Sequence, residues 1–192
     1  MQENINAFLR VLDAGDNSTG GGTASSVAGA MAAGLAAMVA RLSMDKKNLA
    51  PTQTYQTIAA EAEKLSTELF NGGQEDAAAF DRVTRAYKMP KDTAATKDAR
   101  TLAIQKAMQH AAEVPLSNGA RCRRVLELCQ HLEESFNTHA ASDLECAMLL
   151  ASAGLNGCAA NVRINLPYII DESVRKNIED RLETIIGKTP EP

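Results

Sequence analysis

The chain has no tryptophan, and aromatic residues make up only 4% of its 192 residues. Its core must therefore be filled by Ala, Leu, Ile, Val and Met. An excess of positive charge is also missing, because the formal net charge is -4, whereas a general nucleic-acid binder needs a basic surface to neutralise phosphates. The N-terminus has no basic segment followed by an apolar run, so we expect no secretory signal and a cytoplasmic location.

Cysteine is scarce as well. The four cysteines are Cys122, Cys129, Cys146 and Cys158, and none forms a C-x-x-C pair. Cys129 has His131 nearby but lacks the second pair of ligands that a structural zinc site needs. In a reducing compartment, free thiols behave as small buried apolar groups. We therefore predict no metal site and no disulfide.

No segment shows the apolar and polar alternation of a strand, whereas the helical period recurs along the whole chain. No linker rich in Pro, Gly or Ser divides it. We predict one all-α domain, a bundle of about seven or eight helices over residues 1–192 with a frayed tail at 187–192. The expected helices span 3–14, 23–43, about 51–87 with a break or kink at 71–73, 94–112, a new helix after Pro115, 140–162 and 171–186.

Three consecutive glycines lie in the stretch "DNSTGGGTASSVAGAMAAGLAAMVARL", residues 16–42. Residues 24–40 carry no charge, but Ala, Gly and Ser contribute too little transfer free energy for a membrane span. Neither G-x-x-x-x-G-K-[ST] nor G-x-G-x-x-G occurs, which excludes the common phosphate-binding loops. The glycines either let a ligand approach the backbone closely or form a flexible turn before a core helix, and these residues alone favour neither interpretation.

Two of the expected helices, 23–43 and 140–162, consist largely of small residues. A helix that is small or apolar on all sides is buried, either at the centre of a bundle or across a subunit interface. We therefore expect both to be core helices and the chain to form a homodimer.

Several polar residues stand out against these small-residue helices, and each one alone has a structural explanation. Some suit the caps or the charged ends of helices, and others suit a solvated face. The functional alternative is that carboxylates and amides among them surround a ligand. These residues are Lys46, Asp76, Asp81, Ser142, Asp143, Asn161 and Asn165.

Four segments, taken in order and with their spacing, form a specific pattern: "STGGGTASSVAGAMAAGLAAMVARLSMDKK", "QEDAAAFDRVTRAYKMPK", "AAEVPL" and "SDLECAMLLASAGLNGCAANVRINL". The pattern resembles the cyclodeaminase/cyclohydrolase family, which includes the C-terminal half of formiminotransferase-cyclodeaminase and free-standing methenyltetrahydrofolate cyclohydrolases. The resemblance runs from about residue 5 to residue 186. Family members often have a proline where this chain has Thr19, and Asn-Pro where it has Asn137 and Thr138.

The resemblance implies an all-helical homodimer that acts on one-carbon tetrahydrofolates, with no cofactor beyond this substrate and with neither nucleic acid nor membrane as a partner. Two reactions meet at 5,10-methenyltetrahydrofolate. A cyclohydrolase adds water to give 10-formyltetrahydrofolate, and a cyclodeaminase closes 5-formiminotetrahydrofolate with loss of ammonia. We expect the first, because this chain lacks a formiminotransferase half; a separate formiminotransferase would restore the second. A non-catalytic folate-binding or scaffold dimer is the alternative from another class.

Both reactions need one group that removes a proton from the attacker and another that protonates the leaving nitrogen. Asp76 and Asp143 are the candidates, with Asp81 behind them: we expect one carboxylate to handle the proton and stabilise the cationic carbon, and another to hold the amino and ring N–H edge of the pterin. Lys46 is a third candidate, which either acts as an acid or meets the glutamate carboxylates of folate. The expected substrate-binding residues are Gly20, Gly21, Gly22, Asp81, Ser142, Asn161 and Asn165, and we expect all of these groups to converge around one hollow.

Overall fold

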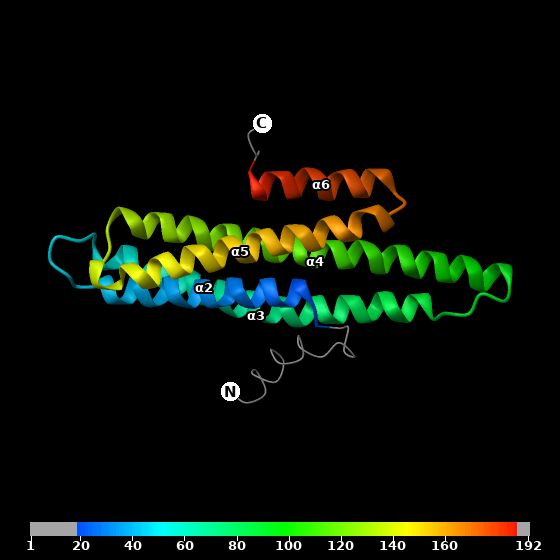
Figure 1. Ribbon diagram of the computed structural model, residues 1–192, viewed down its shortest axis with the longest axis horizontal. Helices are drawn as coiled ribbons and strands as arrows, with labels where there is room; N and C mark the ends of the chain where they lie inside the picture. The colour runs from blue at the N-terminus through cyan, green and yellow to red at the C-terminus, as the bar shows by residue number, and fades with distance from the viewer. Residues whose placement is uncertain (1–18, 188–192) are drawn as a thin grey trace, which may run out of the picture.

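The computed structural model describes residues 19–187 of the chain. Within this range, five α-helices and two short 3₁₀ helices are joined by loops (Figure 1). No strand occurs within these residues, which confirms the all-α class. The helix expected at 3–14 and the tail at 188–192 lie outside them. The elements are α2 (Gly21–Ser43), α3 (Thr52–Tyr87), α4 (Ala94–Glu134), η2 (Thr138–Ala140), α5 (Ala141–Asn165), η3 (Leu166–Tyr168) and α6 (Glu172–Ile186).

Four long helices lie side by side, with α2 and α5 in one layer, α3 and α4 in the layer behind, and α6 packed on the outer side of α4 and α5 (Figure 1). At 1.5 Å per residue, α3 and α4 are about 54 and 62 Å long, whereas α2 and α5 are about 35 and 38 Å long. The α3–α4 hairpin therefore projects beyond the start of α2 and the end of α5. These two helix ends lie against the hairpin partway along its length.

The small-residue helix α2 is at the centre of the bundle, where it contacts α3, α4 and α5. Its Ala32, Ala33, Ala36 and Ala37 are fully or almost fully buried, because side chains of this size let the neighbouring helices approach closely. By length and hydropathy α2 is able to cross a membrane, yet more than half of its most apolar window is buried inside the protein. It packs here as a core helix.

The prediction of two separate helices at 94–112 and after Pro115 is wrong, because both belong to the single helix α4. Proline removes one intrahelical hydrogen bond and crowds the carbonyl four residues earlier, at a cost of about 3 kcal/mol or more. Here Pro115 is buried, and the carbonyl of Ala111 that it leaves unpaired accepts a hydrogen bond from the side-chain amide of Asn165 at 3.0 Å. Tertiary packing thus keeps α4 continuous, and the described residues contain fewer helices than we expected.

The predicted break or kink at the glycines of α3 does not interrupt that helix, which runs on through Gly72 and Gly73. Both glycines are buried. Gly72 faces Asn118 of α4, whose side-chain amide donates to the Ser26 hydroxyl at 2.9 Å and to the Gly72 carbonyl at 3.1 Å. Asn118 also accepts a hydrogen bond from Arg121 at 3.1 Å. The glycine therefore makes room for a buried polar side chain that joins three helices.

A pair of adjacent substitutions tests this packing. A methyl group at Gly72 would overlap the side-chain oxygen of Asn118, so we expect Gly72→Ala to lower the free energy of unfolding by about 1–3 kcal/mol. A methyl group at Gly73 meets only Thr23 and Ser26, at 3.5 Å or more. Gly73→Ala should therefore be neutral or up to ~1 kcal/mol stabilising, because alanine is the better helix former. Urea unfolding compares the two, and equal stabilities would contradict this role of Asn118.

Candidate active site

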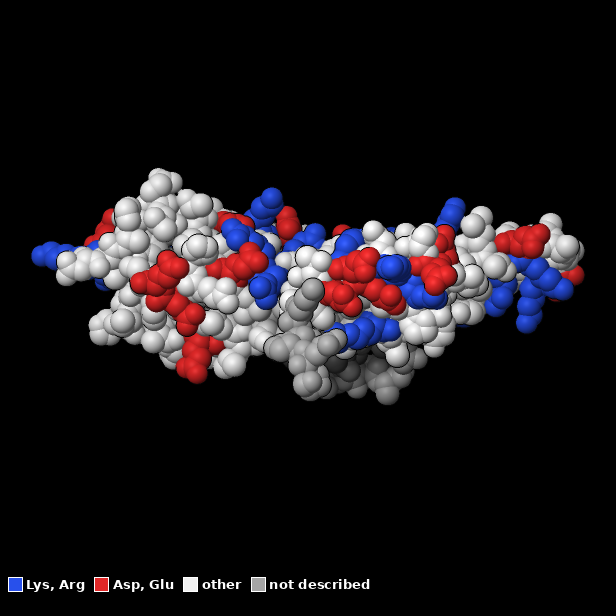
Figure 2. All heavy atoms as spheres, turned by 90° about the horizontal axis from the view of Figure 1, so that it is seen from above, with Lys and Arg blue, Asp and Glu red and all other residues white. Residues whose placement is uncertain are grey.

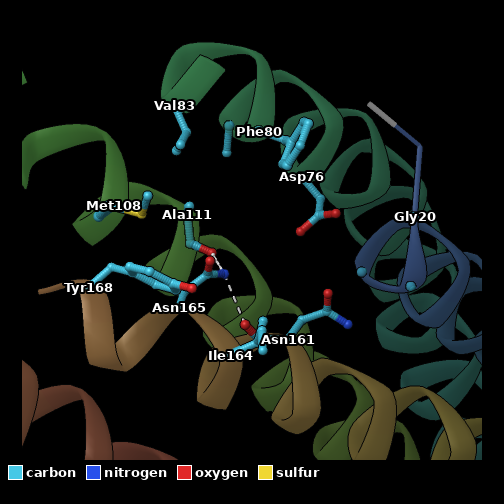
Figure 3. Close-up of a pocket in the computed structure, with 13 residues that line it drawn as sticks. Gly20, Asp76, Phe80, Val83, Met108, Ala111, Asn161, Ile164, Asn165 and Tyr168 are labelled. Atoms are coloured by element: carbon cyan, nitrogen blue, oxygen red, sulfur yellow. Dashed lines mark hydrogen bonds between the residues drawn. The ribbon is translucent and has the colours of Figure 1, made fainter. Parts of the chain in front are cut away.

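A hollow of about 350 Å³ lies where the start of α2 and the end of α5 meet the α3–α4 hairpin (Figure 3). Four helices and the 3₁₀ helix η3 contribute to its wall. The lining residues are Gly20, Gly21, Gly22, Asp76, Ala79, Phe80, Val83, Met108, Ala111, Asn161, Ile164, Asn165 and Tyr168.

Asp76 is the carboxylate of this hollow. It projects from α3 toward the first turn of α2 (Figure 3), where the helix has no side-chain cap and no acidic residue of its own. Burial raises the pKa of Asp76 above its ordinary value, and hydrogen bonds from the hydroxyl and the backbone N–H of Thr23 offset part of this rise. The Thr23 hydroxyl lies 3.5 Å from the carboxylate and 3.1 Å from the Gly73 carbonyl oxygen. A carboxyl of this kind is suited to exchanging protons.

The place of Asp76 depends on the absence of a side chain at Gly22. A methyl group at Gly22 would overlap both carboxylate oxygens, whereas one at Gly20 would meet nothing within 4 Å. Gly21 is intermediate, since a methyl group there would lie 3.3 Å from the side-chain nitrogen of Asn161. Gly21 and Gly22 lie in the first turn of α2 rather than in a separate turn before it. The group that approaches Gly22 closely is the Asp76 side chain of the same chain, so the close approach of a ligand to these glycines stays a prediction.

Two amide side chains from the last turns of α5 form the opposite wall. The side-chain nitrogen of Asn161 donates to the Gly157 carbonyl at 2.8 Å. That of Asn165 donates to the carbonyls of Asn161 at 2.9 Å and Ala111 at 3.0 Å. The described residues include no partner for either side-chain oxygen, and no buried side-chain oxygen lacks a partner. Both amide oxygens are therefore accessible acceptors at the wall of the hollow.

The rest of the wall is largely apolar, although Tyr168 also carries a hydroxyl group. Phe80 and Val83 come from α3, Met108 from α4, Ile164 from α5 and Tyr168 from η3. Phe80, Ile164 and Tyr168 remain about half exposed or more, at 45%, 65% and 54%, so large apolar surfaces are available to a ligand. Apolar walls with hydrogen-bond acceptors and one carboxylate suit a flat heterocycle that carries N–H groups or a positive charge.

The structure brings together six of the ten residues that we predicted for the site, and the expected convergence of all ten does not occur within one chain. Asp81 is exposed and does not line the hollow, since five residues of helix rotate it well away from Asp76. The other three lie at the opposite end of the bundle. Along α5, the 22 residues from Asp143 to Asn165 span about 33 Å. Ser142 and Asp143 are in the first turn of α5, and Lys46 follows the end of α2.

Most of the apolar wall was not predicted from the sequence. Phe80 carried a signal, because it lies four residues after Asp76 on the same helix face. Met108 and Ala111 lie in the part of α4 that precedes Pro115, and Tyr168 lies in the 3₁₀ turn that follows α5. None of these has chemistry of its own that marks it as a site residue. Only the packing of the helices shows that they face the same hollow as Asp76.

The sequence profile described as formiminotransferase-cyclodeaminase matches residues 4–184. The chain belongs to this family. The resemblance inferred from the four segments is thereby confirmed. A methenyltetrahydrofolate cyclohydrolase from Methylorubrum extorquens strain AM1 is 36% identical over 186 residues, which cover 96% of this chain and 88% of that protein.

Two further family members are similar to this chain. The formimidoyltransferase-cyclodeaminase of Rattus norvegicus is 27% identical over 97% of this chain, which spans only 35% of the rat protein. The crystal structure of formiminotetrahydrofolate cyclodeaminase from Thermotoga maritima matches with a TM-score of 0.82 and 31% identity, covering 93% of this chain and 85% of that one. The helical arrangement described above is thus shared within the family.

Substitution of the glycines tests how Asp76 is held. Gly22→Ala should push the carboxylate out toward solvent, which removes the burial that raises the pKa of Asp76 and returns that pKa toward 3.8. Gly20→Ala is the control and should leave the pKa of Asp76 raised. Carbon-detected NMR titration of the Asp76 carboxyl measures both. A raised pKa in the Gly22→Ala variant would show that the close approach at Gly22 does not set the environment of Asp76.

Proposed function

We propose that this chain opens and forms the methenyl bridge of 5,10-methenyltetrahydrofolate, and that its main reaction is hydrolysis to 10-formyltetrahydrofolate. One observation carries the proposal: a half-buried carboxylate, Asp76, faces a hollow that is also lined by the amide groups of Asn161 and Asn165 and by Tyr168. The cyclohydrolase from Methylorubrum extorquens, similar over nearly its whole length, supports the choice of reaction.

The bridging carbon of the substrate is cationic, so the Asp76 carboxylate stabilises it and the water that attacks it. As the water oxygen bonds to this carbon, Asp76 takes one of its protons. The bond from the carbon to N5 then breaks and N5 takes up a proton, so that the formyl group stays on N10 and one proton is released overall. The oxygens of Asn161 and Asn165 accept hydrogen bonds from N–H groups of the pterin, which the apolar walls sandwich.

The cyclodeaminase reaction is the second candidate, because the similar crystal structure from Thermotoga maritima is of a formiminotetrahydrofolate cyclodeaminase. Here N10 attacks the formimino carbon on N5, Asp76 takes the proton from N10, and ammonia leaves with a proton. A separate formiminotransferase would supply this substrate. Parallel assays of water addition to the methenyl compound and of ammonia release from the formimino compound decide between the two. If neither compound is converted, a non-catalytic helical dimer remains.

Substitution of Asp76 tests its role. We expect Asp76→Asn to reduce kcat/KM for methenyl hydrolysis roughly 100- to 10,000-fold, the usual contribution of a general base. Asp76 must be ionised to accept a proton, and its pKa is raised, so wild-type activity should fall on acidification at a higher pH than an ordinary aspartate would allow. The variant should lose this acidic limb. Loss of near-ultraviolet absorbance follows the reaction, and the neighbouring exposed Glu75 provides the control, Glu75→Gln.

The homodimer expected from the sequence remains part of the proposal. We propose that two copies pair across the surface of α2 and α5 that faces away from α3 and α4. Both helices expose large apolar residues, namely Met31, Met38 and Leu42 on α2 and Leu149 on α5, with exposed fractions between 36% and 64%. In an antiparallel pair, the start of α5 from one copy would approach the end of α5 from the other. Such a pair would bring the end of one copy that carries Lys46, Ser142 and Asp143 toward the hollow of the other.

Light scattering tests the dimer. The wild-type mass should be twice 20.5 kDa, and Leu149→Glu should reduce it to that of one chain, because a charge at the centre of an apolar interface is desolvated without a partner. Leu102→Glu is the control, since Leu102 on α4 is similarly exposed but lies off this surface.

The substitution Asp143→Asn tests whether Asp143 of one copy contributes to the hollow of the other copy. An unchanged kcat in Asp143→Asn would remove Asp143 from the site, and a monomeric wild type would remove the dimer.

A further inference from the structure

Pro115 has a consequence for the site although it does not line the hollow. In a continuous α-helix the N–H of residue 115 donates to the carbonyl of residue 111. Proline has no N–H, so the carbonyl of Ala111 loses its helical partner inside α4. Both residues are buried, and a buried carbonyl without a donor is costly. An external donor is therefore required at this point.

Asn165 supplies this donor from the end of α5, and the bond fixes the orientation of its amide. The side-chain nitrogen of Asn165 lies 3.0 Å from the Ala111 carbonyl oxygen and 2.9 Å from the Asn161 carbonyl oxygen, and the dashed lines in Figure 3 mark these two bonds. Both partners are carbonyls, which only accept, so the group between them must be the NH₂. Its two protons are used, and the remaining oxygen is the accessible atom.

We infer that Pro115 is a positioning residue of the substrate site, which acts through the Ala111 carbonyl to hold Asn165 as a pure hydrogen-bond acceptor toward the ligand. The inference deepens the proposed function, because it assigns to Asn165 an N–H group of the bound heterocycle. Without the bond to Ala111, only the Asn161 carbonyl would hold the amide in this orientation, and a flipped amide would present NH₂ to that N–H, where two donors facing each other do not bond. A proline in the middle of a helix thereby selects for an N–H-bearing ligand.

Two substitutions restore the missing N–H with opposite effects on the helix. Alanine is the best helix former and glycine is a poor one, but both give residue 115 an N–H that competes with Asn165 for the Ala111 carbonyl. We expect Pro115→Ala and Pro115→Gly to raise KM for the methenyl substrate by the same factor, roughly 3- to 10-fold for one weakened hydrogen bond, while kcat changes little. Their melting temperatures should differ. A KM that followed the melting temperature instead would make the role of Pro115 purely structural and overturn the inference.

The double variant Pro115→Ala with Asn165→Ala shows whether the two residues act as one unit. If Pro115 acts through Asn165, adding Pro115→Ala to the Asn165→Ala variant leaves KM unchanged. A full additional loss in the double variant would overturn the inference.

A measurement without substrate keeps this inference separate from the proposed function. In ¹⁵N NMR spectra, the side-chain NH₂ protons of Asn165 should exchange more slowly than those of Asn156, an exposed residue of the same helix whose amide nitrogen also bonds a backbone carbonyl. In Pro115→Ala, one of the Asn165 protons should exchange roughly 3- to 10-fold faster. Unaltered exchange would overturn the link between Pro115 and Asn165. Failure of the folate assays with altered exchange would instead count against the proposed function alone.

Discussion

Contacts between a glycine of one helix and a polar side chain of a neighbouring helix determine how closely the helices of this bundle approach one another. Gly22 of α2 faces Asp76 of α3, Gly72 of α3 faces Asn118 of α4, and Gly157 of α5 faces Ser25 of α2. In each case the missing Cβ leaves room for a polar group beside a backbone. Buried polar groups need partners, and the nearby carbonyls and N–H groups of these helices provide them. The site is one product of this packing.

The charge of Asp76 differs from the other charges of the protein. Basic and acidic side chains lie side by side over the face shown in Figure 2. Arg124 with Glu61 and Arg121 with Glu68 form partly solvated ion pairs. Such pairs contribute little to stability. Asp76 has no cationic partner among the described residues, and burial raises its pKa. An unpaired carboxylate in a hollow is a costly arrangement that becomes useful when a cationic ligand or a transferable proton is present.

The hollow forms where regular helical hydrogen bonding stops. Three such places meet at the hollow: the start of α2, the end of α5, and the part of α4 where Pro115 leaves a backbone carbonyl without its helical donor. Helix ends and interruptions leave backbone groups that side chains or ligands must satisfy. Here they orient Asp76 and Asn165, two side chains from helices in different layers. The formiminotetrahydrofolate cyclodeaminase of known structure shares this helical scaffold, and the methenyltetrahydrofolate cyclohydrolase is similar in sequence over 88% of its length. The two reactions act on the same carbon.

Local pattern was sufficient for much of the fold. The helical period predicted most of the helices, and the small residues of α2 predicted its central position, because both features are repeated within one segment. The small residues of α5 pack against α2 and α4, but α5 keeps an exposed face. The ordered segments also identified the family. The pattern predicted interruptions at Pro115 and at Gly72 and Gly73, since an isolated helix would break there. Contacts with Asn165, Asn118 and Thr23 come from other helices, and they are what keeps α3 and α4 continuous.

The sequence by itself was sufficient to name candidates for the chemistry, among them Asp76, Asn161, Asn165 and the glycines Gly20–Gly22, because residue type, spacing and the ordered segments are all local features. Only the tertiary structure decided which of the candidates meet, because a side chain's neighbours across the bundle depend on where each helix starts and how the helices are stacked. Antiparallel stacking brings the start of α2 to the end of α5, and the length of each helix carries Lys46 and Asp143 about 33 Å or more away to the other end.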